Sequence, residues 1–132
     1  GRQLAGLGAL VVCGGGGGVM GAVAQGATEA GGLVIGILPG SDSKSANPWI
    51  GIPLATGMGE ARNALVVQGA EAVISVGGEW GTLSEIALAS KIGLSVGILG
   101  TPPAEGLGLR MLEDPIEAAG WALERAQVFR GS

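Results

Sequence analysis

Two glycine-rich segments are the parts of this chain best suited to chemistry. Gly14 to Gly18 are consecutive glycines that follow an apolar strand pattern at 9–13. The segment 77–82 reads Gly-Gly-Glu-Trp-Gly-Thr and follows a second strand pattern at 72–76. Each segment precedes a helical pattern, and a glycine turn before a helix lets backbone N–H groups converge on an anion at the positive end of the helix dipole. The two segments therefore predict a phosphate site.

The residues expected to contact the ligand come from both segments. They are Gly15, Gly16, Gly17, Gly18 and Met20 from the first, and Gly77, Gly78, Gly81 and Thr82 from the second. Neither segment is a phosphate-loop motif, because no Gly-Lys-Ser/Thr follows. A run of glycines also matches the dinucleotide fingerprint trivially, so that pattern carries little weight here.

Glu85 adds a carboxylate beside the second glycine segment, and Arg62 is a further charged candidate for this site; each has a plainer alternative. Thr82 and Glu85 have the spacing of a capping box, in which a threonine and a glutamate satisfy the first amides of a helix. Arg62 is either a solvated helix charge or a side chain at the edge of a buried apolar stripe, where it would contact a phosphate or a ribose.

Aromatic side chains near the segments have two interpretations each. Trp80 would cover a flat base or pterin ring, or pack at a dimer contact. Asn47 and Trp49 lie in a loop that could act as a lid.

Composition excludes several classes of function. The chain has 132 residues, a net charge of −4, 14% charged residues and 3% aromatic residues. No basic stripe or aromatic platform is present, so a nucleic-acid groove is not expected. With no histidine and one cysteine, histidine-dependent catalysis, a disulfide and a metal site are not expected either. No membrane span or signal peptide is visible, and we expect a cytoplasmic protein.

The order of apolar patterns predicts an α/β fold. Strand-like runs at 9–13, 33–38, 53–56, 72–76 and 94–99 alternate with helical patterns at 18–30, 59–69 and 82–92. Strands alternating with helices indicate βαβ units and a parallel sheet buried on both faces. We therefore expect one Rossmann-like domain over 1–132, with a doubly wound parallel sheet in a three-layer αβα arrangement.

The two ends of the chain add detail to this fold. Residues 1–8 look like the end of a helix, so the usual first strand is expected to be missing. Two explanations remain open: that strand belongs to a longer natural chain, or the sheet has an unusual open edge. A short edge strand is predicted at 109–112. Asp114, Pro115 and Glu117 form an N-terminal helix signature, and that helix is expected to continue to about Phe129.

The order of three motifs resembles the Lonely Guy-like superfamily, once labelled "possible lysine decarboxylases". The motifs are residues 13–24 with 31–39, residues 56–63, and residues 77–85. The resemblance implies a Rossmann-like fold and usually a homodimer. In the superfamily's cytokinin-activating enzymes, an arginine and a glutamate serve hydrolysis of nucleoside 5′-monophosphates to free base and ribose 5-phosphate, and Arg62 and Glu85 match those positions.

Departures from the enzyme pattern point to a sister branch. The enzymes have Pro-Gly-Gly-x-Gly-Thr and Arg-Lys, whereas here Val76 replaces the proline, Asn63 replaces the lysine and the loop is one residue longer. These features are similar to a branch of uncharacterised proteins that includes molybdenum-cofactor carriers, which bind a phosphorylated pterin and catalyse nothing.

Two functions therefore remain open at this point. One is an N-glycosidase acting on a nucleoside 5′-monophosphate. The other is a non-catalytic carrier of molybdenum cofactor or another phosphorylated heterocycle. No cofactor is required by either, although a bound nucleotide, phosphate or molybdopterin-type ligand is expected. A homodimer or a higher homo-oligomer is also expected.

Overall fold

The structure, a computed structural model, describes residues 1–77 and 79–131. It divides the chain into two compact units, residues 1–69 and 70–132, and each unit is described by itself. Gly78, one of the predicted ligand residues, lies outside the described residues.

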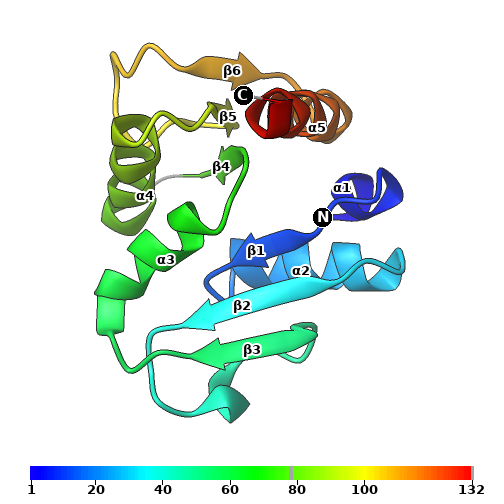
Figure 1. Cartoon of the computed structure of the whole chain (residues 1–132), viewed down its shortest axis with the longest axis vertical. Helices are drawn as coiled ribbons and strands as arrows, with labels where there is room; N and C mark the ends of the chain where they lie inside the picture. Colours follow the sequence, from blue (N-terminus) through cyan, green and yellow to red (C-terminus); the bar gives the residue numbers. More distant parts are fainter. Residues whose placement is uncertain (78, 132) are drawn as a thin grey trace. The chain divides into compact units, whose positions relative to one another are not determined.

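The first unit contains a three-stranded parallel sheet in the order β1-β2-β3. Its strands are β1 (Val11–Cys13), β2 (Val34–Leu38) and β3 (Ile52–Ala55), and its helices are α1 (Arg2–Gly6), α2 (Val19–Glu29) and α3 (Asn63–Gln68). Two short 3₁₀ helices, η1 (Ser43–Ser45) and η2 (Gly59–Arg62), complete it. In Figure 1 the three strands lie side by side with α2 behind them.

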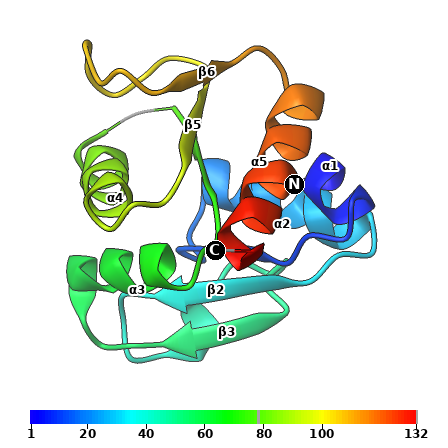
Figure 2. The same cartoon turned by 45° about the horizontal axis from the view of Figure 1, so that its top comes forward.

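The core of the first unit forms between α2 and one face of this sheet. Ala24 and Ala27 of α2 are fully buried and cluster with Val11 and Val34 of the paired strands β1 and β2. Trp49 packs against this cluster. Helix α1 lies beside α2 (Figure 2). Because alanines and β-branched residues face each other here, helix and sheet approach closely.

The second unit repeats the same plan. It contains β4 (Val73–Val76), α4 (Trp80–Lys91), β5 (Val96–Leu99), β6 (Arg110–Leu112) and α5 (Pro115–Gly131), with the parallel strand order β4-β5-β6. Helices α4 and α5 cover opposite faces of this sheet (Figures 1 and 2). Trp121 of α5 lies over Gly97 of β5, where an added Cβ would come within 2.9 Å of the indole ring.

Helices alternating with parallel strands give the α/β class that the sequence predicts. All five expected strands are present, together with the short strand at 110–112 and the helix at the start of the chain. The expectation of a single domain stays a prediction. Among the described residues, every helix is too short or too polar to span a lipid bilayer.

The capping box predicted for Thr82 and Glu85 is wrong. Helix α4 begins at Trp80, so Thr82 lies inside its first turn, and the N-cap residue is Glu79, whose side chain makes no capping hydrogen bond. The main chain becomes helical immediately after the glycines, and Leu83 N already donates to Glu79 O at 3.0 Å. Thr82 is therefore not the residue that caps α4.

The N-terminus of α5, in contrast, is capped as the sequence predicts. Asp114 Oδ1 accepts a hydrogen bond of 2.8 Å from Glu117 N, and Glu117 Oε2 accepts one of 2.8 Å from Glu113 N. Asp114→Ala is expected to lower the free energy of unfolding by about 1 kcal/mol, because the amide of Glu117 loses its acceptor. Urea denaturation measures this. Glu113→Ala keeps its backbone N–H and serves as the control; an equal loss in both variants would contradict the capping role.

An ion pair joins the last turn of α5 to the segment before β4. Arg130 Nη2 donates to Glu71 Oε1 at 2.6 Å, and this hydrogen bond, with the adjacent positive charge, lowers the pKa of Glu71 from its ordinary 4.5. Because the carboxyl has the lower pKa in the folded state, its contribution to stability is present above the unfolded pKa and is lost as the pH falls through the folded value.

We expect wild type to unfold at a higher temperature than Glu71→Gln at neutral pH. The difference is expected to shrink as the pH falls below 4.5. Circular dichroism melts over a pH series measure it. A constant difference across that range would contradict the linkage.

Candidate functional site

The first glycine segment joins β1 to α2 in a turn that only glycine accommodates at several positions. Gly14 and Gly15 are buried, while Gly17 and Gly18 are exposed. Gly15 and Gly18 have φ values of +77° and +60°, the left-handed region that other residues rarely adopt. Gly18 is the N-cap of α2, and it has no side chain to satisfy the first amides of the helix.

Arg62 packs directly against this segment. Its side chain is only 8% exposed, and its Nη1 donates to the carbonyl oxygen of Ile37 at 3.3 Å. A Cβ added to Gly14 would lie 1.8 Å from Arg62 Nη1 and 2.7 Å from Met20 Sδ. Glycine at position 14 therefore makes the space that the guanidinium occupies.

Arg62 retains hydrogen-bonding capacity at this position. Its Nε is buried and has no hydrogen-bond partner among the described residues. A buried guanidinium nitrogen without an acceptor is costly, and such groups are usually satisfied by a ligand or by water. Of the two interpretations of Arg62, the solvated helix charge is wrong, because the side chain is buried. The apolar stripe expected on the same helix face is incomplete, since Leu65 is 40% exposed.

Asn47 also contacts the glycine segment. Its Nδ2 donates to the carbonyl oxygens of Gly16 at 2.8 Å and Gly15 at 3.4 Å, and its backbone N donates to Gly15 O at 3.0 Å. The sequence placed Asn47 in a loop that could act as a lid, and its contact with the glycines was missed. One feature of the sequence could have indicated this contact. An asparagine in a loop can hold neighbouring backbone, because its side chain carries both a donor and an acceptor.

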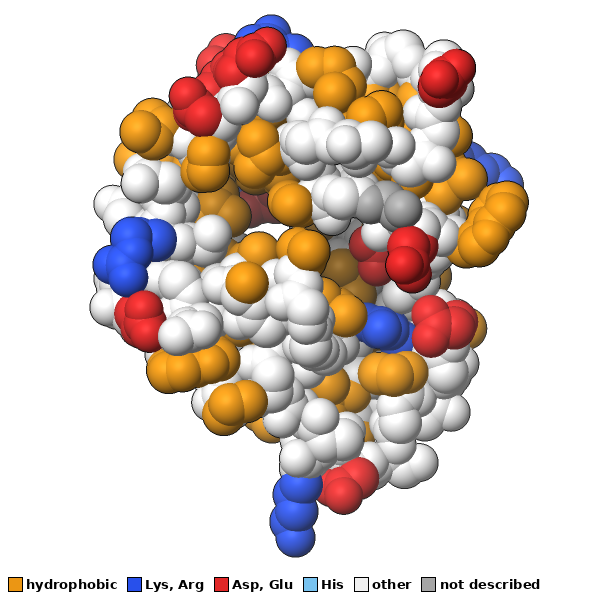
Figure 3. All heavy atoms as spheres, turned by 180° about the vertical axis from the view of Figure 1, so that it is seen from behind, with side chains coloured by type: hydrophobic (Ala, Val, Ile, Leu, Met, Phe, Trp, Pro, Cys, Tyr) orange, Lys and Arg blue, Asp and Glu red, His pale blue; other side chains and the backbone are white. Residues whose placement is uncertain are grey.

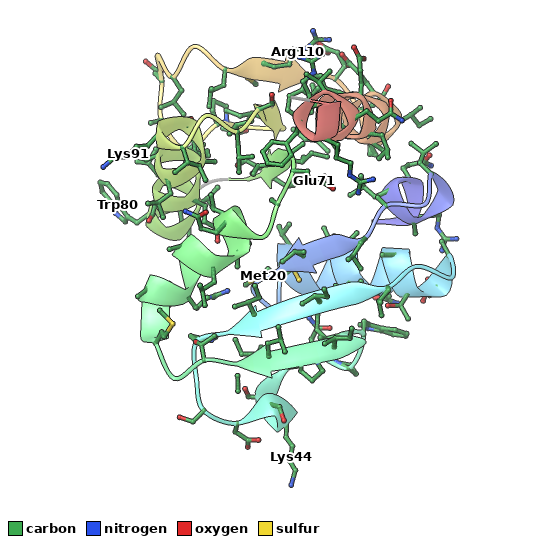
Figure 4. The ribbon with its side chains drawn as sticks, viewed as in Figure 1. Met20, Lys44, Glu71, Trp80, Lys91 and Arg110 are labelled. Carbon is green, nitrogen blue, oxygen red and sulfur yellow. The ribbon has the colours of Figure 1, made fainter. Side chains whose placement is uncertain are left out.

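The second glycine segment joins β4 to α4 within the other unit. Gly77 has a φ of +74°, Gly81 and Thr82 lie in the first turn of α4, and Glu85 is half-buried one turn further on. Ser75, near the end of β4, is buried, and its hydroxyl has no hydrogen-bond partner among the described residues. Trp80 is 86% exposed and points away from α4 (Figure 4).

One hollow in the second unit is formed by other residues. It has a volume of about 410 Å³ and is lined by Arg110, Glu117, Trp121, Glu124 and Arg125. Arg110 pairs with Glu117 at 2.8 Å and Arg125 with Glu124 at 3.4 Å. Because these charges neutralise each other, the hollow lacks the excess positive charge that a phosphate site needs.

The structure thus brings together part of the predicted site. Gly14, Gly15, Gly16, Met20 and Arg62 form one cluster in the first unit. Gly77, Gly81, Thr82 and Glu85 lie along one strand–helix junction in the second. The predicted convergence of the two glycine segments on one ligand stays a prediction.

Comparison with known proteins identifies the class of the fold and the family. The model of the SLOG cluster4 family matches residues 1–120, and the chain belongs to this family. A protein of uncharacterised function from Archaeoglobus fulgidus is 45% identical over 123 residues, which cover 93% of this chain and 80% of that protein.

Two solved structures are similar over nearly the whole chain. The molybdenum cofactor carrier protein of Chlamydomonas reinhardtii is 32% identical with a TM-score of 0.83, and the match covers 96% of this chain and 83% of that one. The molybdenum cofactor binding protein of Rippkaea orientalis is 31% identical with a TM-score of 0.82, covering 96% and 85%. These matches confirm the Rossmann-like fold and the branch indicated by the three motifs.

Proposed function

We propose that this protein binds a phosphorylated planar heterocycle of the molybdopterin type and releases it unchanged. One observation carries the proposal: a buried guanidinium, that of Arg62, lies against a glycine turn at the start of α2 and keeps an unsatisfied N–H. Charge-assisted hydrogen bonds from arginine, together with amides at a helix N-terminus, form a typical phosphate site. The two similar structures belong to proteins named for molybdenum cofactor, which supports this class of ligand.

The remaining predicted ligand residues have roles in the same proposal. The junction from Gly77 to Thr82 supplies a second glycine turn before a helix, suited to another polar group of the ligand. Trp80 exposes its indole, which is available to a flat ring or to a partner subunit. Both interpretations of Trp80 stay open.

Titration tests this function directly. Nucleotides, inorganic phosphate and phosphorylated pterins are added while binding is followed by calorimetry. Saturable binding of a phosphorylated heterocycle, tighter than that of inorganic phosphate, is the expected result. Failure of the whole panel to bind at millimolar concentration would contradict the proposal.

The second candidate function is hydrolysis of a nucleoside 5′-monophosphate, with Arg62 and Glu85 as catalytic residues. Glu85 favours it, because a half-buried carboxylate one turn into α4, after the glycine turn, can stabilise an oxocarbenium-like transition state. Incubation with AMP and other monophosphates distinguishes the two. A carrier releases no free base. An enzyme releases base and loses at least about tenfold in rate in Glu85→Gln, equivalent to about 1.4 kcal/mol in the barrier.

The proposal includes a homodimer. Trp80, Ile116 and Val128 are large apolar side chains that are mostly exposed, and Figure 3 shows hydrophobic side chains exposed at several places on one face. A dimer that covers these side chains would remove their apolar surface from water. Light scattering at micromolar concentration should give twice the 12.8 kDa of one chain. A monomer mass that persists at rising concentration would contradict the dimer.

A further inference from the structure

We infer that Asn47 is a positioning residue that turns the peptides of the glycine segment so that the amides of Gly16 and Gly17 face a phosphomonoester. This inference rests on the proposed function and names the group that the site recognises. It concerns the first unit alone.

The hydrogen bonds of Asn47 fix the orientation of two successive peptides. Its side chain and backbone amide hold the carbonyl oxygen of Gly15, and its side chain holds that of Gly16. In a planar trans peptide the C=O and the following N–H point in opposite directions. The N–H groups of Gly16 and Gly17 are therefore turned away from Asn47.

Asn47 is itself held rigidly. Its Oδ1 accepts a hydrogen bond of 3.0 Å from Trp49 N, and its carbonyl accepts one of 3.2 Å from Ile50 N. Thr28 Oγ1 on α2 donates to Trp49 O at 2.8 Å, which ties this loop to the helix that follows the glycines. The loop around Asn47 therefore serves as a fixed support for the glycine segment.

The amides that Asn47 turns away remain available to a ligand. In the part of the chain that the structure describes, the N–H groups of Gly16 and Gly17 have no acceptor. They precede α2, whose N-cap has no side chain, and Arg62 contributes a buried Nε without a partner beside Gly14. Several N–H donors with a guanidinium and a helix dipole match the oxygens and the double negative charge of a phosphomonoester.

The test uses inorganic phosphate as the probe and the whole chain as the protein. In wild type, phosphate should move the amide resonances of Gly16 and Gly17 in a saturable manner. Asn47→Ala and Asn47→Asp should weaken phosphate binding by at least about tenfold. Both variants lack the side-chain N–H that holds the carbonyl oxygens of Gly15 and Gly16, so the loop amides lose their fixed direction. Asn47→Asp retains an acceptor for Trp49 N, so it separates the contact with the glycines from the fold of the loop.

Thr28→Val is the matched control. It removes the hydrogen bond to Trp49 O from the same loop but leaves the hydrogen bonds that Asn47 makes to Gly15 and Gly16. Its phosphate affinity should stay within about twofold of wild type even where its melting temperature falls. An equal loss of affinity in Thr28→Val and Asn47→Ala would overturn the inference, since both would then act through general stability.

The outcomes also separate this inference from the proposed function. If phosphate moves the Gly16 and Gly17 amides but no phosphorylated heterocycle binds, the proposed function fails and the positioning role stands. If a heterocycle binds without moving these amides, the positioning role is overturned and the proposed function stands. The wild-type resonances show whether these amides face phosphate even where Asn47→Ala fails to fold. The comparison of Asn47→Asp with Thr28→Val then decides whether Asn47 positions them.

Discussion

Arg62→Met should weaken binding of a phosphorylated ligand by about 10-fold to 100-fold. The guanidinium supplies charge-assisted hydrogen bonds, each of which contributes about 1.5–3 kcal/mol. The methionine side chain fills much of the same buried space beside Gly14 and Met20 but donates nothing. Arg62→Lys should recover only part of the affinity, because an ammonium group cannot reproduce the planar fork of the guanidinium. Calorimetric titration of the three proteins measures these differences.

Arg2→Met is the matched control for charge. It removes the same single positive charge from the first unit, but Arg2 is exposed on α1 and pairs with Glu29 at 3.2 Å. Its ligand affinity should stay within about twofold of wild type, since exposed charges are screened by salt. If Arg2→Met and Arg62→Met lose affinity equally, Arg62 contributes only to the general charge of the protein.

Gly14→Ala should impair both the fold and the site. Its Cβ would lie 1.8 Å from Arg62 Nη1, so the guanidinium must move away from the glycine turn. This movement would break its hydrogen bond to Ile37 O. Overpacking of this kind costs about 1–3 kcal/mol. We also expect a loss of ligand affinity of at least about tenfold, comparable to removing one charge-assisted hydrogen bond. Urea denaturation and calorimetric titration measure the two effects.

Gly6→Ala provides the control for adding a methyl group. Gly6 ends α1, has no atom within 4 Å of an added Cβ and does not have a positive φ. Its stability should be unchanged or slightly higher, because alanine restricts the unfolded chain. Normal ligand affinity in a folded Gly14→Ala protein would show that Arg62 is not part of the ligand site.

The elements of the fold could be predicted because each is encoded locally. Apolar runs such as 34–38 and 96–99 are too short for helices and end in glycine or proline turns, so their strand character is readable without tertiary information. The cap of α5 was predictable for the same reason. The start of α4 could not be predicted in this way. The residues Gly-Glu-Trp-Gly before Thr82 include no strong capping residue, and the helix begins at Trp80, two residues before Thr82.

The candidate site was only partly predictable because its contacts are long-range. The sequence identifies the glycine turn, since five consecutive glycines lie between a strand pattern and a helical pattern. It does not show that Arg62 fills the space left by Gly14, or that Asn47 holds the carbonyls of Gly15 and Gly16. These contacts join residues more than thirty positions apart. Whether such residues meet depends on the path of the chain between them, which local sequence patterns do not reveal.

The positions of the tryptophans make the folding of each unit separately observable. Trp49 packs against the core of the first unit, and Trp121 lies over Gly97 in the second, while Trp80 is largely in solvent. Fluorescence of a variant that keeps only Trp49 reports unfolding of residues 1–69, and one that keeps only Trp121 reports unfolding of residues 70–132. Coincident transitions would mean one cooperative domain, and separate transitions would mean two.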